Sequence, residues 1–181
     1  LVQVESNIQA ARLALEKGRK SGAITILNPA PINDLLTADL LSLSDVITPN
    51  ETEFIFLFKH LLKQSVSDNF WTIEDRALHE LCRKLTVSTV VLTLGDKGCF
   101  VSQIDTFYRV PPIKINLIDS TGAGDAFSGG LAAGLVKFSG DLKQSVKFAT
   151  VVAGLSTQRA GTAPAMPSCE EVRARFENEY F

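Results

Sequence analysis

The chain has 181 residues, of which 45% are hydrophobic and 21% are charged, and its formal net charge is −2. That length suits one compact domain rather than two, and the charge lacks the basic excess that nucleic-acid binding requires, so we expect no nucleic-acid partner. No apolar run approaches the roughly 20 residues of a membrane span, so we expect no membrane partner either.

The first half of the chain alternates short apolar segments with helical patterns. We expect strands over residues 1–4, 23–27, 45–48 and 89–94, and helices over 7–22, 35–43, 50–62 and 72–85. Asn7 and Asn50 are of a residue type that caps helices, and Gly22 is typical of a helix end. Such alternation favours a parallel sheet with right-handed crossovers and helices on both faces. Ligands of such sheets bind at the carboxyl ends of the strands.

The remaining segments are a meander and three helices. Gly95-Asp96-Lys97-Gly98 predicts a tight turn into a strand over 99–102, followed by a short strand over 106–110. Asn28-Pro29-Ala30-Pro31 indicates a rigid loop, because the prolines fix φ. A glycine-bearing loop over 119–124 precedes helices expected over 125–138, 142–157 and 170–178. Small residues in the first of these helices permit close approach to its neighbours.

Two further features concern the state of the chain. Cys82, Cys99 and Cys169 have no metal or redox spacing, which indicates reduced thiols in a cytoplasmic protein, two or more of them buried. The chain starts without Met and directly in the apolar stretch Leu1–Val4. We therefore expect a fragment that lacks its N-terminal part.

The strongest chemical signal is Asp119-Ser120-Thr121-Gly122-Ala123-Gly124-Asp125-Ala126-Phe127. The backbone N–H groups of Gly122, Ala123 and Gly124, at the start of a helix, can point together at an anion such as a transferring phosphoryl group. Asp125 can then accept the proton of an attacking sugar hydroxyl. The alternative is a plain loop in which Asp caps the helix. A Walker loop and a dinucleotide fingerprint are excluded, because their lysine and strand spacing are absent.

The stretch 119–130 resembles the second signature of the ribokinase-like (PfkB) carbohydrate kinase family. Further segments resemble the same family in the same order: Gln3-Val4-Glu5, Asn28-Pro29-Ala30-Pro31, Thr48-Pro49-Asn50-Glu51-Thr52-Glu53, Thr93-Leu94-Gly95-Asp96-Lys97-Gly98 and Gln158-Arg159-Ala160-Gly161-Thr162. The resemblance covers essentially the whole chain. It implies an α/β, three-layer, parallel-sheet fold, with residues 1–181 as one kinase domain that lacks its N-terminal part and most of its lid.

The resemblance also implies ATP, Mg²⁺ and K⁺ as cofactors. Asn50 would contact ATP phosphates, and Glu53 would order Mg²⁺ through water. Their alternative roles are an N-cap and a first-turn carboxylate, and both interpretations can hold together. The residues implied to line the nucleotide are Thr93, Leu94, Gly95, Asp96, Lys97, Gly98 and Gly124, with Thr150 at the adenine.

For the sugar, the resemblance implies D-ribose or a similar substrate. Asp125 would be the base on its primary hydroxyl, and Glu5 would touch its hydroxyls, although a strand-end Glu is more often merely exposed. Asp119, which can also form a turn by itself, would bind K⁺ with Thr121. The other positions of this cation loop are backbone oxygens near Ser156, Arg159 and Gly161, and Ala165, where some members have a cation-binding Ser.

The resemblance thus implies an ATP-dependent ribose kinase that makes ribose 5-phosphate. The alternatives are a kinase for fructose, a deoxyribose or a nucleoside, and a non-catalytic nucleotide-binding module. Since the sugar-binding part of the family is missing, we expect this chain to bind nucleotide better than sugar and to show little kinase activity alone. The complete protein could form a homodimer through its lid.

Overall fold

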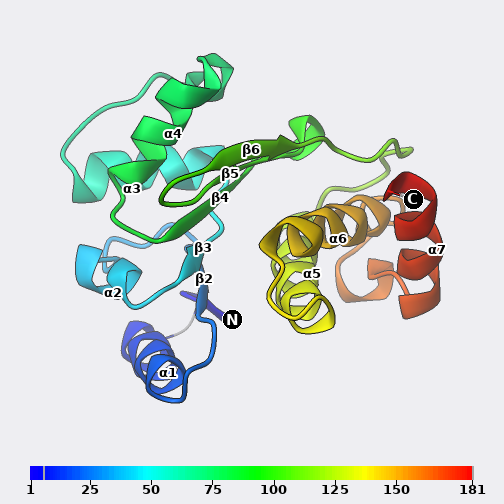
Figure 1. The fold of residues 1–181 in the computed structure, drawn as a ribbon, viewed down its shortest axis with the longest axis horizontal. Helices are drawn as coiled ribbons and strands as arrows, with labels where there is room; N and C mark the ends of the chain where they lie inside the picture. Colours follow the sequence, from blue (N-terminus) through cyan, green and yellow to red (C-terminus); the bar gives the residue numbers. More distant parts are fainter. Residues whose placement is uncertain (6, 181) are drawn as a thin grey trace. The chain divides into compact units, whose positions relative to one another are not determined.

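A computed structural model describes residues 1–5 and 7–180 of the chain. The chain forms two compact units (Figure 1). The first contains Leu1–Leu94 and Phe100–Arg109, and the second contains Gly95–Cys99 and the residues from Val110 onward.

Within the described residues the strands form one six-stranded sheet in the order β1-β2-β3-β4-β5-β6. The strands β1 (Val2–Gln3), β2 (Ile26–Asn28), β3 (Val46–Ile47) and β4 (Thr89–Thr93) pair in parallel. The strands β5 (Cys99–Ser102) and β6 (Phe107–Val110) follow through connections that are too short for a parallel crossover, so they continue the sheet as an antiparallel meander. The expected parallel strands and meander are confirmed.

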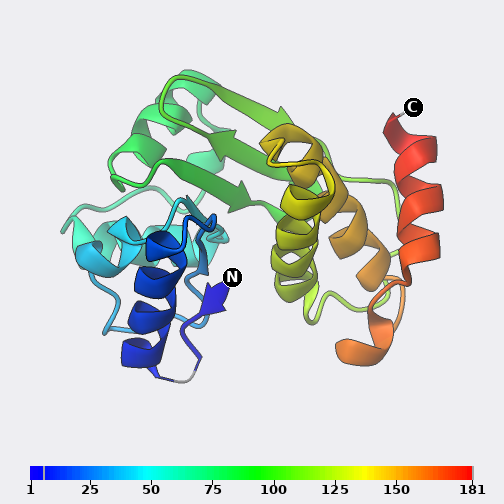
Figure 2. The same cartoon turned by 60° about the horizontal axis from the view of Figure 1, so that its bottom comes forward.

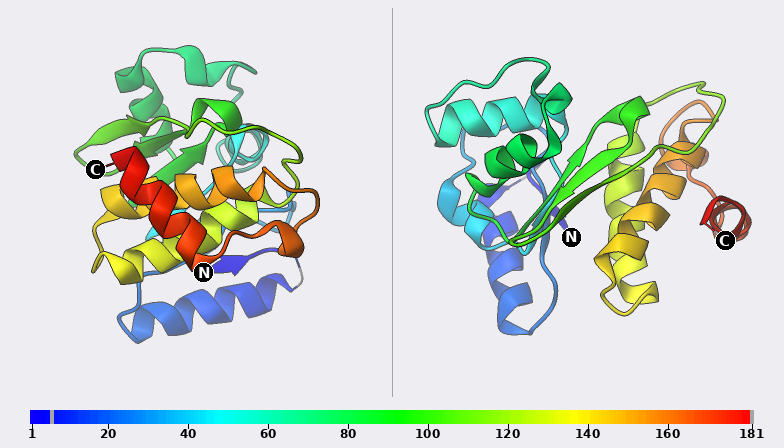
Figure 3. Two further views of the ribbon diagram at one scale, coloured as in Figure 1. Left: turned by 90° about the vertical axis from the view of Figure 1, so that its right-hand side faces the viewer. Right: turned by 45° about the horizontal axis from the view of Figure 1, so that its top comes forward.

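Four helices belong to the first unit: α1 (Ile8–Lys20), α2 (Ala38–Ser42), α3 (Glu51–Leu61) and α4 (Asp75–Arg83). Because β1 to β4 follow one another in space as they do in the chain, right-handed crossovers place these helices on one face of the parallel strands (Figure 3). Asn7 caps α1 as expected, accepting bonds from the N–H groups of Gln9 (2.8 Å) and Ala10 (3.1 Å).

Two helices are shorter than the sequence predicts. The helix expected over 35–43 begins only at Ala38, because the Thr37 hydroxyl caps it and the Asn33 side chain accepts a bond from the Leu35 N–H at 2.9 Å, which turns the preceding segment. The helix expected over 72–85 is split into a 3₁₀ turn, η1 (Phe70–Thr72), and α4. Phe70 lies in the core, stacked on Phe54 with ring centroids 4.6 Å apart, and the chain turns there before α4 starts.

The core of the first unit lies between its helices and the sheet. Phe54, Leu57 and Phe58 of α3 are fully buried, and they join Val90 and Leu92 of β4 in one cluster. Burial of side chains of this size contributes about 1.5–3 kcal/mol each. The packing fixes α3 relative to the carboxyl end of β4.

The second unit contains α5 (Ala123–Lys137), α6 (Leu142–Ser156) and α7 (Cys169–Tyr180), with the 3₁₀ turns η2 (Gly95–Lys97) and η3 (Ala163–Ala165) (Figure 2). The helices α5 and α6 are in close contact, as the small residues predict. A Cβ at Gly134 would lie 2.8 Å from Ser145 Cα, and one at Gly130 would lie 3.0 Å from Ala149 Cα.

The cysteines agree with the prediction of free, mostly buried thiols. Cys82 and Cys99 are buried, Cys169 is exposed, and none is in a disulfide. Burial raises the pKa of Cys82 and of Cys99 to about 12, so both thiols stay protonated at neutral pH. Across residues 1–5 and 7–180, none of the helices has the length and apolar character needed to cross a membrane.

Candidate functional site

In the first unit, residues that the sequence singles out lie at the carboxyl ends of neighbouring parallel strands. Asn50, after β3, forms an isolated parallel bridge with Thr93 at the end of β4, and the Thr93 N–H donates to the Pro49 carbonyl at 2.9 Å. Glu5 is exposed just beyond β1, where the preceding Val4 N–H donates to the Ala30 carbonyl at 3.0 Å. This edge is where open α/β sheets bind ligands.

Asn50 and Glu53 form a complete capping box at the start of α3. Asn50 Oδ1 accepts a bond from the Glu53 N–H at 2.9 Å, and Glu53 Oε2 accepts one from the Asn50 N–H at 2.9 Å. Asn50 Nδ2 also donates to Glu53 Oε1 at 3.0 Å. Both carboxylate oxygens of Glu53 therefore accept protein donors, and its role toward Mg²⁺ through water stays a prediction.

The nucleotide turn expected at Gly95–Gly98 is a 3₁₀ turn, closed by a bond from the Gly98 N–H to the Gly95 carbonyl at 3.1 Å. Gly98 has φ +79°, and a Cβ there would meet the Val110 carbonyl oxygen at 2.1 Å. Asp96 and Lys97 form an exposed ion pair at 2.8 Å, and this hydrogen bond lowers the pKa of Asp96. The turn thus needs glycine for backbone packing, whatever it binds.

Thr150 and Leu94, both expected at the nucleotide, are buried. The Thr150 hydroxyl donates to the Val146 carbonyl one turn earlier in α6, at 2.9 Å, and its side chain hydrogen-bonds the Cys99 thiol. The polar atom of Thr150 is therefore occupied inside the second unit. Its contact with adenine stays a prediction.

The glycine loop of the second unit leads directly into α5. Gly122 is the N-cap, with the left-handed φ of +78°, and its carbonyl accepts the N–H of Ala126 at 2.9 Å, the first full helical bond. The helix thus starts at Ala123, two residues earlier than expected. The Ala123 N–H donates to the Ser120 carbonyl at 3.1 Å, so it is not directed at a ligand as the sequence suggested.

Gly124 and Asp125 follow in the first turn of α5, and both are exposed. A Cβ at Gly124 would have no described heavy atom within 4 Å, so open space lies over this first-turn backbone. The first turn of a helix has N–H groups without an intrahelical partner and carries the positive end of the helix dipole. The backbone at Gly124 is therefore open to an approaching anion, with the Asp125 carboxylate in the same turn.

Asp119 ties this loop to the segment that follows α6. Its Oδ1 accepts the N–H of Thr121 at 2.9 Å and the Thr121 hydroxyl at 2.6 Å, and its Oδ2 accepts the Gly161 N–H at 2.9 Å. The hydroxyl bond from Thr121, with these N–H bonds, lowers the pKa of Asp119 to about 2. The structure thus brings Asp119, Thr121 and Gly161 together.

At the remaining positions of the predicted cation loop, the side chain either interacts with another group or is apolar. Ser156 donates its hydroxyl to the Ala153 carbonyl at 2.8 Å, Arg159 pairs with Glu171, and Ala165 is buried in η3. Asp119 Oδ2 accepts one described donor, the Gly161 N–H, and K⁺ binding by this loop stays a prediction. Among the residues that the structure describes, no group of three or more His, Cys, Asp or Glu could hold a metal ion.

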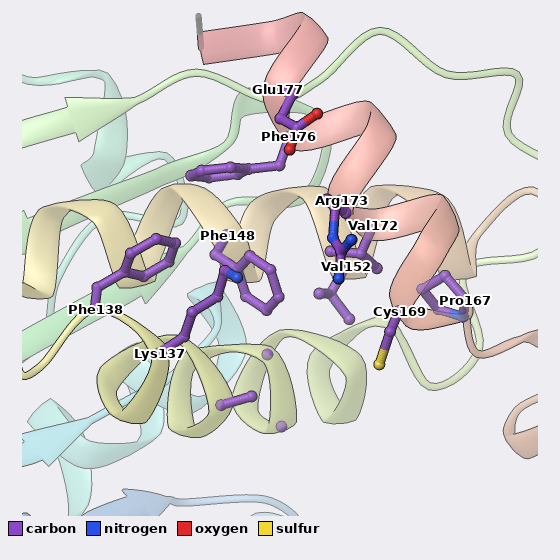
Figure 4. Close-up of a pocket in the computed structure, with 13 residues that line it drawn as sticks. Lys137, Phe138, Phe148, Val152, Pro167, Cys169, Val172, Arg173, Phe176 and Glu177 are labelled. Atoms are coloured by element: carbon purple, nitrogen blue, oxygen red, sulfur yellow. The ribbon is translucent and has the colours of Figure 1, made fainter.

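A separate cavity of about 560 Å³ lies among α5, α6 and α7 (Figure 4). Phe148 and Phe176 line it, together with Lys137 and Arg173. No predicted site residue is among the 13 described residues shown in the figure.

Three residues shape the loop through contacts that the sequence did not predict. The Ser120 carbonyl binds Ala123, the Thr157 carbonyl accepts the N–H groups of Ile118 (2.8 Å) and Asp119 (3.1 Å), and the Thr162 side chain lies 3.2 Å from the Cβ position of Gly122. The contacts of Ser120 and Thr157 are backbone–backbone hydrogen bonds, which any residue type can make, so the sequence pattern could not predict them.

Comparisons with known proteins match this arrangement. The sequence profile described as "pfkB family carbohydrate kinase" matches residues 1–169. The chain is 34% identical to ribokinase of Staphylococcus aureus over 95% of the chain and 54% of the relative. It is 32% identical to deoxyribokinase of Salmonella typhi over 99% of the chain and 55% of the relative.

Solved structures give the same result. The crystal structure of ribokinase from Thermotoga maritima matches with a TM-score of 0.77 and 28% identity, covering 92% of this chain and 52% of that one. Arabidopsis thaliana ribokinase complexed with ribose and ATP matches with a TM-score of 0.80 and 26% identity, covering 97% and 54%. The chain spans about half the length of the curated relatives it matches. By its sequence, its mixed α/β fold and the extent of these matches, the chain belongs to the pfkB family of carbohydrate kinases.

Proposed function

We propose that this chain is the nucleotide-binding and catalytic part of an ATP-dependent sugar kinase that converts D-ribose to ribose 5-phosphate. The observation that carries the proposal is the N-terminus of α5. There, the left-handed Gly122 starts the helix, open space lies over Gly124, and the exposed Asp125 follows in the same turn.

The proposed reaction is an in-line transfer of the γ-phosphoryl group. The oxygen of the sugar's primary hydroxyl attacks phosphorus, its proton passes to the Asp125 carboxylate, and ADP leaves. The helix dipole and the N–H groups of Gly122 and Gly124 stabilise the charge on the phosphoryl oxygens. Ala123 joins them only if its N–H leaves the Ser120 carbonyl.

Asn50 contacts ATP phosphates, Glu53 orders Mg²⁺ through water, and residues 93–98 with Thr150 line the nucleotide. The bound Mg²⁺ would neutralise phosphate charge during transfer. K⁺ binds in the second unit at Asp119, Thr121 and the backbone oxygens of residues 156–161, where it stiffens the anion site.

Ribose is the first candidate for the acceptor, because relatives at 32–34% identity are named ribokinase, and Glu5 is the residue proposed to touch it. A deoxyribose or fructose is the second candidate, since matched relatives also include a deoxyribokinase and a fructokinase. A non-catalytic nucleotide-binding role is the third. A homodimer and a cytoplasmic location remain predictions.

Two measurements test the proposal. In the first, ADP and MgATP are titrated calorimetrically into the wild-type chain and into Asp125→Asn. We expect both proteins to bind nucleotide, because the proposed base is not a phosphate ligand. A wild-type chain that is folded by circular dichroism and yet binds neither nucleotide would refute the nucleotide site.

In the second, single-turnover phosphoryl transfer by the complete protein, rather than by this chain alone, is followed with ribose, deoxyribose, fructose and inosine. Asp125→Asn should lower the rate at least about 10²-fold, as expected for loss of a general base. The matched control is Asp105→Asn, which changes an exposed carboxylate of the β5–β6 turn and should leave the rate unchanged. Equal rates for Asp125→Asn and wild type would remove the catalytic role, and a poorer rate with ribose than with the other acceptors would remove the ribose assignment.

A further inference from the structure

We propose that Glu171 of α7 is a positioning residue for the glycine loop at residues 119–124, acting through Arg159 and the segment 157–162. This inference rests on the proposed function, because it assigns the loop's geometry to a residue outside the phosphate and sugar sites. On this proposal, the N-terminus of α7 helps to hold the glycine loop, and with it the proposed phosphate site, in position.

The glycine loop is held mainly by the segment 157–162. The Thr157 carbonyl accepts the N–H groups of Ile118 and Asp119, and the Gly161 N–H donates to Asp119 Oδ2 at 2.9 Å. The other oxygen of Asp119 binds both polar atoms of Thr121, so the carboxylate connects the two segments directly. A shift of Gly161 therefore moves Asp119 and, through it, the turn that precedes Gly122.

The segment 157–162 is irregular, with turns and bends but no helix or strand. It lies between the end of α6 and η3, and Gly161 has a left-handed φ of +95°. Within it, the Arg159 guanidinium forms an ion pair with Glu171 Oε1. This ion pair joins the segment 157–162 to α7.

Glu171 is itself firmly placed. It is the third residue of α7 and forms a reciprocal cap with Ser168, whose N–H donates to Oε2 at 2.7 Å and whose hydroxyl accepts the Glu171 N–H at 3.2 Å. The neighbouring Val172 and Phe176 are buried in the core of the second unit with Ile113 and Val151. One carboxylate thus uses one oxygen to cap α7 and the other to hold Arg159.

The two roles of Glu171 can be separated by substitution. Glu171→Gln keeps an acceptor for the Ser168 N–H but removes the charge that pairs with Arg159. Arg159→Gln removes the same ion pair from the other side and does not alter the cap. Ser168→Ala weakens the cap and keeps the ion pair, so it is the matched control for a purely structural role.

The experiment measures amide hydrogen exchange at Thr121 and Gly161 in the full chain, together with melting temperature. Glu171→Gln and Arg159→Gln should each raise exchange at both amides about 2- to 5-fold, the range expected for an exposed ion pair, and their effects should not add in the double variant. Ser168→Ala should lower the melting temperature and leave exchange at these two amides unchanged. Wild-type exchange in both Glu171→Gln and Arg159→Gln would overturn the proposal.

Calorimetric titration of MgATP links the positioning to the site. Affinity should fall by a similar factor in Glu171→Gln and Arg159→Gln and stay unchanged in Ser168→Ala. If the wild-type chain binds no nucleotide, the proposed function fails while the exchange data still test the positioning. If it binds and the ion-pair variants bind equally well, the link between Glu171 and the phosphate site is refuted.

Discussion

The substitution Gly124→Ala should stabilise the folded protein and, at the same time, weaken its nucleotide binding. Its Cβ would meet no described heavy atom within 4 Å, so the folded chain accepts it without strain. Alanine in place of glycine within a helix is favourable by about 0.5–1 kcal/mol. For a chain of this size, that corresponds to a rise of roughly 1–4 °C in melting temperature.

The same methyl group would occupy the space proposed for the phosphate. Blocking close approach of an anion to one backbone donor should reduce MgATP affinity at least about tenfold, or about 1.4 kcal/mol. Gly129→Ala is the matched control, because Gly129 lies in α5, is exposed and also has open space at its Cβ. It should raise the melting temperature by a similar amount and leave affinity unchanged.

Calorimetric titration and thermal melting of the two variants decide the question together. Equal affinities in Gly124→Ala and Gly129→Ala, with both proteins folded, would refute the phosphate assignment at the start of α5. A Gly124→Ala protein that is less stable than wild type would instead contradict the open space that the structure shows there.

Two further outcomes follow from single positions. Gly98→Ala should lower the free energy of unfolding by several kcal/mol, because its Cβ would lie 2.1 Å from the Val110 carbonyl oxygen. Gly95→Ala should lower it by only about 1–2 kcal/mol, because Gly95 has φ +53° but open space at its Cβ. Urea unfolding measures both variants, and similar midpoints for the two would refute this packing. The pKa values of Asp119 and Glu171 are lowered to about 2 from ordinary values of 3.8 and 4.5, so both carboxylates stabilise the fold above those values, and that stability is lost as pH falls from about 4.5 toward 2. Asp119→Asn should flatten this part of the melting-temperature profile, and a profile identical to that of wild type would contradict it.

The order of elements in the first unit was predictable because each carries a strong local signal. Asn7 and Asn50 cap their helices as expected, and the apolar run at Thr89–Thr93 is a buried parallel strand. The start of α4 was not predictable, because Ile73 continues the apolar period but is 37% exposed. Its position depends on Phe70, whose ring stacks on Phe54 in the core, and a helical period does not reveal such a long-range contact.

The glycine loop was found from its sequence, but its hydrogen bonds were not. Small residues before an Asp predict a backbone that a ligand can approach, and the open space at Gly124 agrees with that expectation. The bond from Ala123 to the Ser120 carbonyl was unexpected because any residue type can make it. Thr150 is predicted to lie at the adenine, and within α6 its hydroxyl donates to the carbonyl of Val146, as threonine often does inside a helix; the contact with adenine stays a prediction.

The N-termini of α3 and α5 explain why a capping interpretation and a binding interpretation need not compete. At α3, Asn50 and Glu53 satisfy each other's hydrogen-bonding groups in a capping box. Removing such a cap costs about 1 kcal/mol. A ligand that contacts the outer faces of these side chains, directly or through a water, would leave the cap intact. At α5, the described residues provide no side-chain cap, because Gly122 has no side chain, and the open space over Gly124 faces the positive end of the helix. An anion there would supply the missing cap. The uncapped terminus of α5 is therefore better suited than the capped terminus of α3 to accept an anion directly.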